Sequence, residues 1–278
     1  MPSPLPLSTK FRLGPVITDE QRDFLDEHGF LHFEQVATPD EVAMITREMQ
    51  RIQDEWHAAG RTRVYGIPLF WGKDAQGKPF LQRLAFTSVF SEAIRRFVRD
   101  ERFRPILGLV GTDARIGDAE KDGVVINRFI NLPGSVYPKL GWHTDGLRDL
   151  FYGRMPQRML NIGLHLDHCT RDNGGLRLIP GSQNQGFWDM CFRKLYFLSH
   201  APDPAEICVE TTAGDLTVHD GRLWHRVAQS EHVGTPSLRR SMYLPYLTGP
   251  FEPKSDESPT PAYHRIGEWL RGRVLKRA

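Results

Sequence analysis

The 278-residue sequence has little cysteine, little excess charge and no long apolar run. Its three widely spaced cysteines, Cys169, Cys191 and Cys208, form neither a disulfide framework nor a cluster of zinc-binding thiolates. The 36 basic and 34 acidic residues leave a net charge of only +2, so charge does not predict a nucleic-acid partner. No apolar run approaches the roughly 18 residues that span a bilayer. We therefore expect a protein that binds neither nucleic acid nor membrane.

The start of the chain also lacks a targeting signal. Residues 1–10 have neither the charged start nor the apolar stretch of a secretory signal peptide, so we expect a cytoplasmic protein. The composition, 40% hydrophobic and 25% charged, is that of an ordinary globular protein with a large core. It excludes a disordered chain. The sequence leaves the oligomeric state open.

Helix signals come first along the chain. Thr18-Asp-Glu-Gln21 and Thr38-Pro-Asp-Glu41 are capping boxes, and apolar residues at helical spacing follow each of them. Between them, residues 30–36 alternate in the manner of a strand. Residues 61–86 are rich in glycine, proline and aromatics, which favours hairpins or a covering loop. We expect residues 1–122 to form a mainly helical support and lid.

From Gly123 onward the pattern changes to short strand-like runs separated by turn residues. These runs are 124–130, 159–166, 176–179, 207–211, 216–219 and 238–244. Short strands at this spacing predict a sandwich or barrel and not repeated βαβ units. We expect an all-β core over 123–250 and an amphipathic C-terminal helix within 251–278, packed on the barrel. Residues 1–278 would then form one domain with an all-β core and added helices.

His143-Thr-Asp145 is the sharpest candidate for a site. Residues i and i+2 of an extended segment point to the same side, so both side chains can bind one cation. A second histidine from a facing strand would complete the two-histidine, one-carboxylate triad of non-haem Fe(II). His165-Leu-Asp167 has the same spacing, but it ends an apolar strand before a turn. We interpret this second pair as structural.

Three histidines are candidates for the distant ligand. His225 follows a glycine turn at the start of a strand and fits best, His219 is the second choice, and His232 resembles a loop residue. On the next predicted strand, Arg239 could bind the far carboxylate of a dicarboxylate through a bidentate pair. Arg240 should point to the opposite face of that strand.

These segments together resemble the phytanoyl-CoA dioxygenase family of Fe(II)- and 2-oxoglutarate-dependent oxygenases. The matching segments are 142–146, 173–182, 213–225 and 238–239. The resemblance extends from about residue 18 to residue 247 and is most specific in the Asn-Gly-Gly to Pro-Gly-Ser element. It implies a double-stranded β-helix, a jelly-roll (cupin-like) barrel with helices packed outside.

The resemblance also implies roles for single residues. It implies that His143, Asp145 and His225 bind the iron, and that Arg239 binds the C5 carboxylate of 2-oxoglutarate.

Three departures affect the cosubstrate pocket. Where many members have a serine two residues after the distal histidine, this chain has Val227. It has Gln229-Ser230 where an asparagine usually follows, and Asn131 precedes the Pro-Gly turn in place of a basic residue. Arg128 or Asn127 could compensate by reaching the cosubstrate.

The resemblance predicts an enzyme that uses Fe(II), 2-oxoglutarate and O2. We expect it to hydroxylate an unactivated C–H bond of a small molecule, with release of succinate and CO2. Two alternatives stay open: a metal-binding cupin-like enzyme that does not use 2-oxoglutarate, and a catalytically silent binding barrel. Aromatics and arginines in 61–71 and 187–196 would cover the barrel mouth and favour an apolar substrate with an acidic group.

Overall fold

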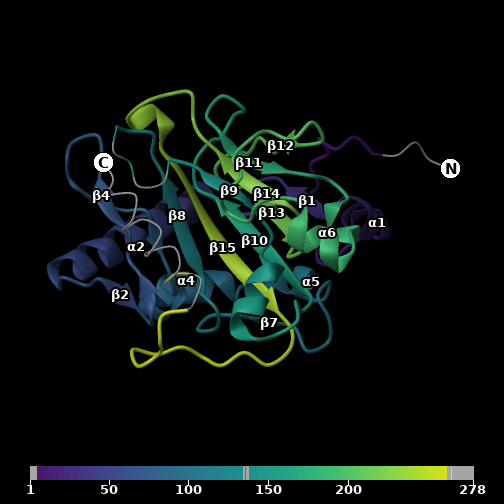
Figure 1. The fold of residues 1–278 in the computed structure, drawn as a ribbon, viewed down its shortest axis with the longest axis horizontal. Helices are drawn as coiled ribbons and strands as arrows, with labels where there is room; N and C mark the ends of the chain where they lie inside the picture. The colour runs from purple at the N-terminus through teal and green to yellow at the C-terminus, as the bar shows by residue number, and fades with distance from the viewer. Residues whose placement is uncertain (1–4, 134, 136–137, 262–263, 265–278) are drawn as a thin grey trace.

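The computed structural model describes residues 5–133, 135, 138–261 and 264. Two antiparallel sheets form its centre (Figure 1). The strands of the large sheet are β1 (Phe30–Phe33), β6 (Arg83–Leu84), β7 (Arg115–Ile116), β8 (Val125–Phe129), β10 (Met159–His165), β13 (Leu216–Asp220) and β15 (Arg239–Leu247). The strands of the small sheet are β9 (Leu140–His143), β11 (Gly175–Leu178), β12 (Ile207–Cys208) and β14 (His225–Ala228).

The strand order is that of two facing sheets of different width. The large sheet runs β1-β13-β10-β15-β8-β6, with β7 also paired to β15, and the small sheet runs β12-β11-β14-β9. Such a pair of antiparallel sheets is the arrangement of a jelly roll. The all-β core predicted for 123–250 is present, and β1, β6 and β7 from the preceding part of the chain extend its large sheet.

Alternation along the strands separates an apolar outer face from a polar interior. On β13, Leu216 and Val218 are fully buried in the main hydrophobic cluster. Thr217 and His219 point the other way, into the space between the sheets, where Thr217 lies 3.1 Å from the Nε2 atom of His165. The main core therefore lies behind the large sheet, and the interior is left for polar groups.

The two predicted capping boxes begin the first two helices. Thr18 caps α1 (Asp19–His28), and Thr38 caps α2 (Pro39–Ala58), each through reciprocal side-chain and backbone hydrogen bonds. Gly29 ends α1 with a φ of 81°, a left-handed conformation that glycine adopts without strain. In Figure 1 the α2 helix lies beside the strands of the large sheet, and its Ile45, Met49 and Ile52 belong to the main hydrophobic cluster.

Hairpins follow these helices, as predicted for 61–86. They are formed by β2 (Arg63–Val64) with β3 (Ile67–Pro68) and by β4 (Trp71–Lys73) with β5 (Pro79–Leu81). The remaining helices are α3 (Thr87–Phe90), α4 (Glu92–Val98), α5 (Arg104–Leu107), α6 (Phe187–Phe192) and the 3-10 turns η1 (Glu101–Phe103), η2 (Gly146–Tyr152), η3 (Ser182–Asn184) and η4 (Thr235–Ser237).

Of the segment 251–278, for which a C-terminal helix is predicted, residues 251–261 form no helix and His264 is helical. The rest of the predicted helix lies outside the described residues. Among the helices that the structure describes, none has the length and the apolarity to cross a membrane.

Candidate metal centre

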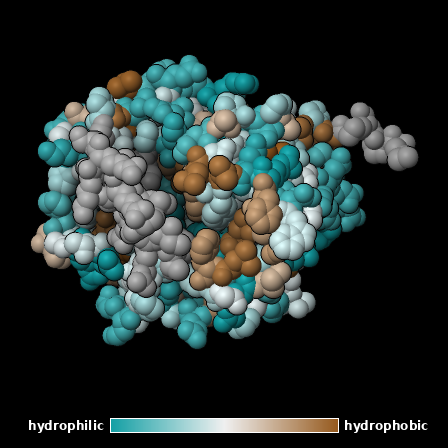
Figure 2. Space-filling model, in the orientation of Figure 1, coloured by the Kyte–Doolittle hydropathy of each residue, from teal (hydrophilic) through white to brown (hydrophobic). Residues whose placement is uncertain are grey.

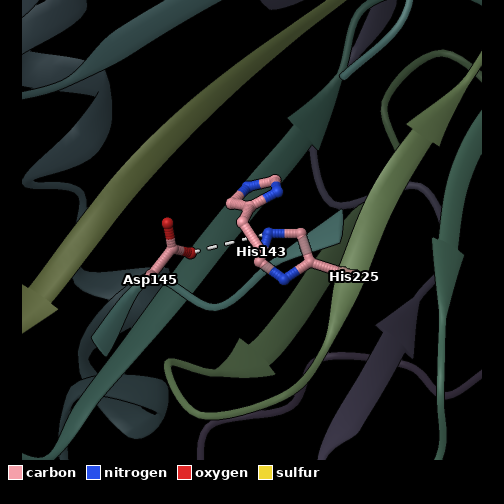
Figure 3. Close-up of side chains that lie close together, drawn as sticks. All are labelled: His143, Asp145 and His225. Carbon is pink, nitrogen blue, oxygen red and sulfur yellow. Dashed lines mark ion pairs between the residues drawn. The ribbon is translucent and has the colours of Figure 1, made fainter. Parts of the chain in front are cut away.

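Two strands of the small sheet bring the predicted triad together. His143 ends β9 and His225 begins β14, and the two residues are directly paired across these antiparallel strands. Asp145 follows two residues after His143. One potential ligand atom from each of the three side chains lies within 4.8 Å of those of the other two, and all three residues are buried. Figure 3 shows their side chains close together beside the two strands.

Backbone carbonyls orient both imidazoles. The Nδ1 atom of His143 lies 2.8 Å from the carbonyl oxygen of Gly141, and Nδ1 of His225 lies 2.9 Å from that of Leu223. Since a carbonyl oxygen only accepts, each Nδ1 carries the proton and donates it. Each Nε2 then has a free lone pair, which is the form in which histidine binds a metal.

The ionisation of the three side chains suits a divalent cation. Burial lowers the pKa of His143 to about 4, and it lowers the pKa of His225 well below its usual value. Burial alone would raise the pKa of Asp145, but Arg148 and the neighbouring histidines outweigh it and hold that pKa well below its usual value. At neutral pH the group therefore offers two neutral imidazoles and one carboxylate, the donor set of mononuclear non-haem iron sites.

Residues from other parts of the chain fix the carboxylate of Asp145. The Nη2 atom of Arg148 donates to its Oδ1 atom at 2.8 Å, and Nδ2 of Asn161 donates to its Oδ2 atom at 2.7 Å. Arg148 also donates to Asp122 at 2.8 Å. Asn161 was not predicted from the sequence, although it is one of only two polar residues, with His165, in the otherwise apolar run 159–166.

The triad lines a cavity of about 560 Å³, a volume typical of small-molecule sites. Asn127 and Val227, both singled out from the sequence, line the same cavity. Phe70 reaches it from the first predicted covering segment, and Phe197 and Leu198 reach it from directly after the second. The ring of Phe197 stacks on His143 with centroids 4.8 Å apart.

A family model described as Phytanoyl-CoA dioxygenase (PhyH) matches residues 25–241. The chain belongs to this family. The family predicted from the sequence is thereby confirmed.

Two curated relatives carry names that state a cosubstrate or a reaction. A "Probable alpha-ketoglutarate-dependent hypophosphite dioxygenase" of Stutzerimonas stutzeri is 25% identical over 175 residues, which cover 63% of this chain and 56% of the relative. An "Ectoine dioxygenase" of Streptomyces coelicolor is 29% identical over 180 residues, which cover 61% of this chain and 52% of the relative. The chain thus spans about half the length of the curated relatives that it matches.

Solved structures show the same fold. AviO1 from Streptomyces viridochromogenes superposes with a TM-score of 0.59 at 19% identity, covering 84% of this chain and 96% of that one. EvdO2 from Micromonospora carbonacea, solved with 2-oxoglutarate, gives a TM-score of 0.57 at 18% identity, covering 88% and 96%. The predicted jelly roll is confirmed, and the curated relatives carry names of the enzyme class that the sequence predicts, dioxygenases.

Arg239 is a buried cation on β15 beside the cavity. Its guanidinium donates to the carbonyl oxygens of Asn173 and Pro138, and its buried Nε has no hydrogen-bond partner among the described residues. Burial lowers its pKa to about 10, so it stays charged at neutral pH. None of the carboxylates described forms an ion pair with it. It lies just behind the cavity wall, 5.6 Å from the ring of the lining residue Phe129.

Arg128, the other arginine considered for the cosubstrate, lies on the opposite face of the large sheet. Its guanidinium stacks 4.1 Å from the ring centroid of Phe80 and donates to the side chain of Gln53. It is opposite Arg240 in the register of β8 and β15. Because neighbours along a strand point to opposite faces, Asn127 faces the cavity and Arg128 cannot. We therefore assign Arg128 no role in cosubstrate binding.

The second His-x-Asp pair has structural partners, in agreement with its interpretation. His165 lies against Thr217, and Asp167 accepts from the Nε atom of Arg240 at 2.9 Å on the outer face. His232 lies in a loop 3.3 Å from Asp172, both half exposed. Neither these two histidines nor these two aspartates join the cluster of potential ligands.

Proposed function

We propose that this chain is an Fe(II)- and 2-oxoglutarate-dependent dioxygenase that hydroxylates a C–H bond of a small molecule. His143, Asp145 and His225 would be the iron ligands. The observation that supports this most is the meeting of two neutral Nε2 atoms and an ionised carboxylate in the cavity of a phytanoyl-CoA dioxygenase family member. When bound, iron with 2-oxoglutarate and O2 supplies the oxidising power, and succinate and CO2 are released.

The protein's own part is to hold the ligands and the cosubstrate in place. The carbonyls of Gly141 and Leu223 fix the two imidazoles, and Arg148 and Asn161 fix the carboxylate. This support keeps the ligands in one geometry before the metal arrives, and hydrogen bonds that orient metal ligands in this way raise metal affinity.

Arg239 would bind the C5 carboxylate of 2-oxoglutarate. A buried guanidinium without an acidic partner is unfavourable until an anion arrives, so the anion gains a charge-assisted pair away from water. Asn127 lines the cavity on the neighbouring strand and would supply a further polar contact. Val227, also in the lining, brings no hydroxyl to this pocket.

We further propose that the substrate has an apolar body and an acidic group. Phe70, Phe197 and Leu198 give the cavity an apolar wall, while Lys139 and His200 line it with basic groups. In the described part of the chain, no carboxylate lies within ion-pair distance of Lys139. Figure 2 shows apolar side chains gathered near the centre of the face in view, and Leu198 itself is 67% exposed.

The other cations of the cavity wall already have acidic partners. Arg83 and Arg148 both donate to Asp122, at 2.6 and 2.8 Å, and Lys121 donates to Asp149 at 2.6 Å. A substrate carboxylate or phosphate would gain least from cations that are already neutralised. This contrast favours Lys139 as the contact for the acidic group.

We also propose that the protein acts in the cytoplasm. The three cysteines are free thiols, and thiols and Fe(II) both persist best in a reducing compartment. Fractionation of cells that produce the protein, followed by immunodetection, tests this location; recovery outside the cytoplasmic fraction would contradict it.

The function is tested by titrating the anaerobic apoprotein with Fe(II) and 2-oxoglutarate while recording the visible spectrum. We expect a weak, saturable charge-transfer band that needs both components and is absent from Asp145→Ala. Metal binding without such a band would favour a cupin-like enzyme that does not use 2-oxoglutarate. Absence of metal binding by the folded protein would favour a silent binding barrel.

A further inference from the structure

His219 lies inside the barrel beside the proposed iron site, although it is not one of the three proposed ligands. Its ring centroid is 4.5 Å from that of His225, and its Nε2 atom is 3.4 Å from Oδ2 of Asp145. The side chain is only 1% exposed. Since His219 comes from β13, it approaches Asp145 from the large sheet, whereas His143 and His225 belong to the small sheet.

The ring of His219 lacks the partners that a buried polar side chain needs. Neither of its nitrogens has a hydrogen-bond partner among the described residues. A buried polar group without a partner destabilises the folded state, because the hydrogen bonds to water that it loses on folding are not replaced. The nearest acceptor is Oδ2 of Asp145, which lies a few tenths of an ångström beyond the usual hydrogen-bond length.

Asn161 approaches the same oxygen atom. Asn161 and His219 are directly paired across β10 and β13, and both side chains point into the interior. The amide of Asn161 donates to Oδ2 at 2.7 Å, while Arg148 donates to Oδ1 at 2.8 Å. Two neighbouring strands of the large sheet thus direct one side chain each at a single oxygen of the carboxylate.

We propose that His219 is a positioning residue of the metal centre, which donates its Nε2–H to Oδ2 of Asp145. With Asn161 and Arg148 it fixes the plane of the carboxylate, so that the ligand needs no reorganisation when a metal binds. This inference rests on the proposed function, because it takes Asp145 to be a metal ligand. It gives His219 a role in metal affinity in addition to the roles of the three proposed ligands.

The test measures metal affinity of the full-length apoprotein by anaerobic titration with Co(II). We expect His219→Phe, which keeps a ring but removes the donor, to bind Co(II) about 10- to 100-fold more weakly, the usual effect of losing a hydrogen bond to a metal ligand. His219→Gln keeps a donor and should restore most of the affinity. His165→Phe removes a neighbouring interior histidine that lies against Thr217, and it should leave the affinity unchanged.

Unchanged affinity in His219→Phe would overturn the proposal, and so would an equal loss in His165→Phe, because packing alone would then explain it. Circular dichroism confirms that each variant is folded. A second measurement uses the unmutated protein and needs no variant to fold: pulsed EPR of its Cu(II) form counts the coordinated imidazoles. Two imidazoles support the proposal, and three would overturn it by showing that His219 is itself a ligand.

These outcomes are distinguishable from failure of the proposed function. If the protein binds Co(II) with the expected ranking of variants but shows no band with 2-oxoglutarate, the function fails and the role of His219 stands. If Fe(II) and 2-oxoglutarate give the band and His219→Phe binds Co(II) as tightly as the parent, the role fails alone. If the parent binds no metal, both are overturned.

Discussion

Replacing Arg239 with alanine would remove the only charged group that we propose to contact 2-oxoglutarate. Arg239 is 5% exposed, and its guanidinium donates to the carbonyl oxygens of Asn173 and Pro138. Its Nε atom has no hydrogen-bond partner among the described residues. At neutral pH it is charged, because burial lowers its pKa only to about 10. The alanine variant would therefore leave the C5 carboxylate of the cosubstrate without the charged partner that we propose for it.

The size of the effect follows from the strength of charged hydrogen bonds. One such bond contributes about 1.5–3 kcal/mol, and leaving the carboxylate unpaired takes the loss to the upper end of that range. Because 1.36 kcal/mol corresponds to a factor of ten, about 3 kcal/mol raises the 2-oxoglutarate requirement on the order of 100-fold. Arg239→Lys keeps a positive charge but not the planar fork, so it should recover only part of this loss.

The assay is the 2-oxoglutarate dependence of the Fe(II) chelate band, measured anaerobically so that no substrate is needed. Arg240→Ala is the matched control, since this neighbouring arginine pairs with Asp167 on the outer face. We expect its 2-oxoglutarate requirement to stay near that of the parent. An unchanged requirement in Arg239→Ala, with Fe(II) binding intact, would refute the reasoning and move the role to another cation such as Arg83, which lines the cavity.

Three further predictions concern the ligands, the substrate and the pH dependence of stability. Asp145→Ala should abolish Fe(II)-dependent succinate formation, whereas His165→Ala should leave it measurable; the opposite result would reverse our choice of pair. Lys139→Ala should remove the preference for acidic over neutral compounds in a screen for stimulated succinate release, without changing the 2-oxoglutarate requirement; a preserved preference would refute the acidic-group contact. Burial lowers the pKa of His165 to about 3 from a usual 6.5. When the pH is lowered, the imidazole is therefore protonated in the unfolded state before it is protonated in the folded state. The free energy of unfolding should therefore fall as the pH drops through this window, by up to about 1.4 kcal/mol per pH unit from this group, and His165→Phe should flatten the slope in denaturant titrations.

The sequence alone was sufficient for features encoded locally. The capping boxes at Thr18 and Thr38 involve residues three positions apart, and both helices begin where these residues predict. The pairing of His143 with His225 could also be anticipated, since a strand end and a glycine turn mark the mouth of a barrel. Period two correctly separated Arg239 from Arg240.

The same rule, applied to β8, would have placed Arg128 beside Ile126 on the outer face and kept it out of the cosubstrate pocket. Other residues were beyond reach, because contacts between distant segments have no local signature. Asp122 meets Arg83 and Arg148 only after β6 has paired with β8 and the 3-10 turn η2 has taken its place beside them. The closeness of His219 to Asp145 likewise depends on how the two sheets face each other.

The most direct test of the central claim is to supply Fe(II), 2-oxoglutarate and ¹⁸O₂ to the purified protein and to analyse the succinate by mass spectrometry. Cosubstrate turnover is measurable even without a known substrate, because slow uncoupled decarboxylation also yields succinate. We predict succinate that carries one ¹⁸O atom and whose formation is lost in Asp145→Ala. Succinate without the label, or none at all from protein that binds Fe(II), would contradict the assignment of this chain as a 2-oxoglutarate-dependent dioxygenase.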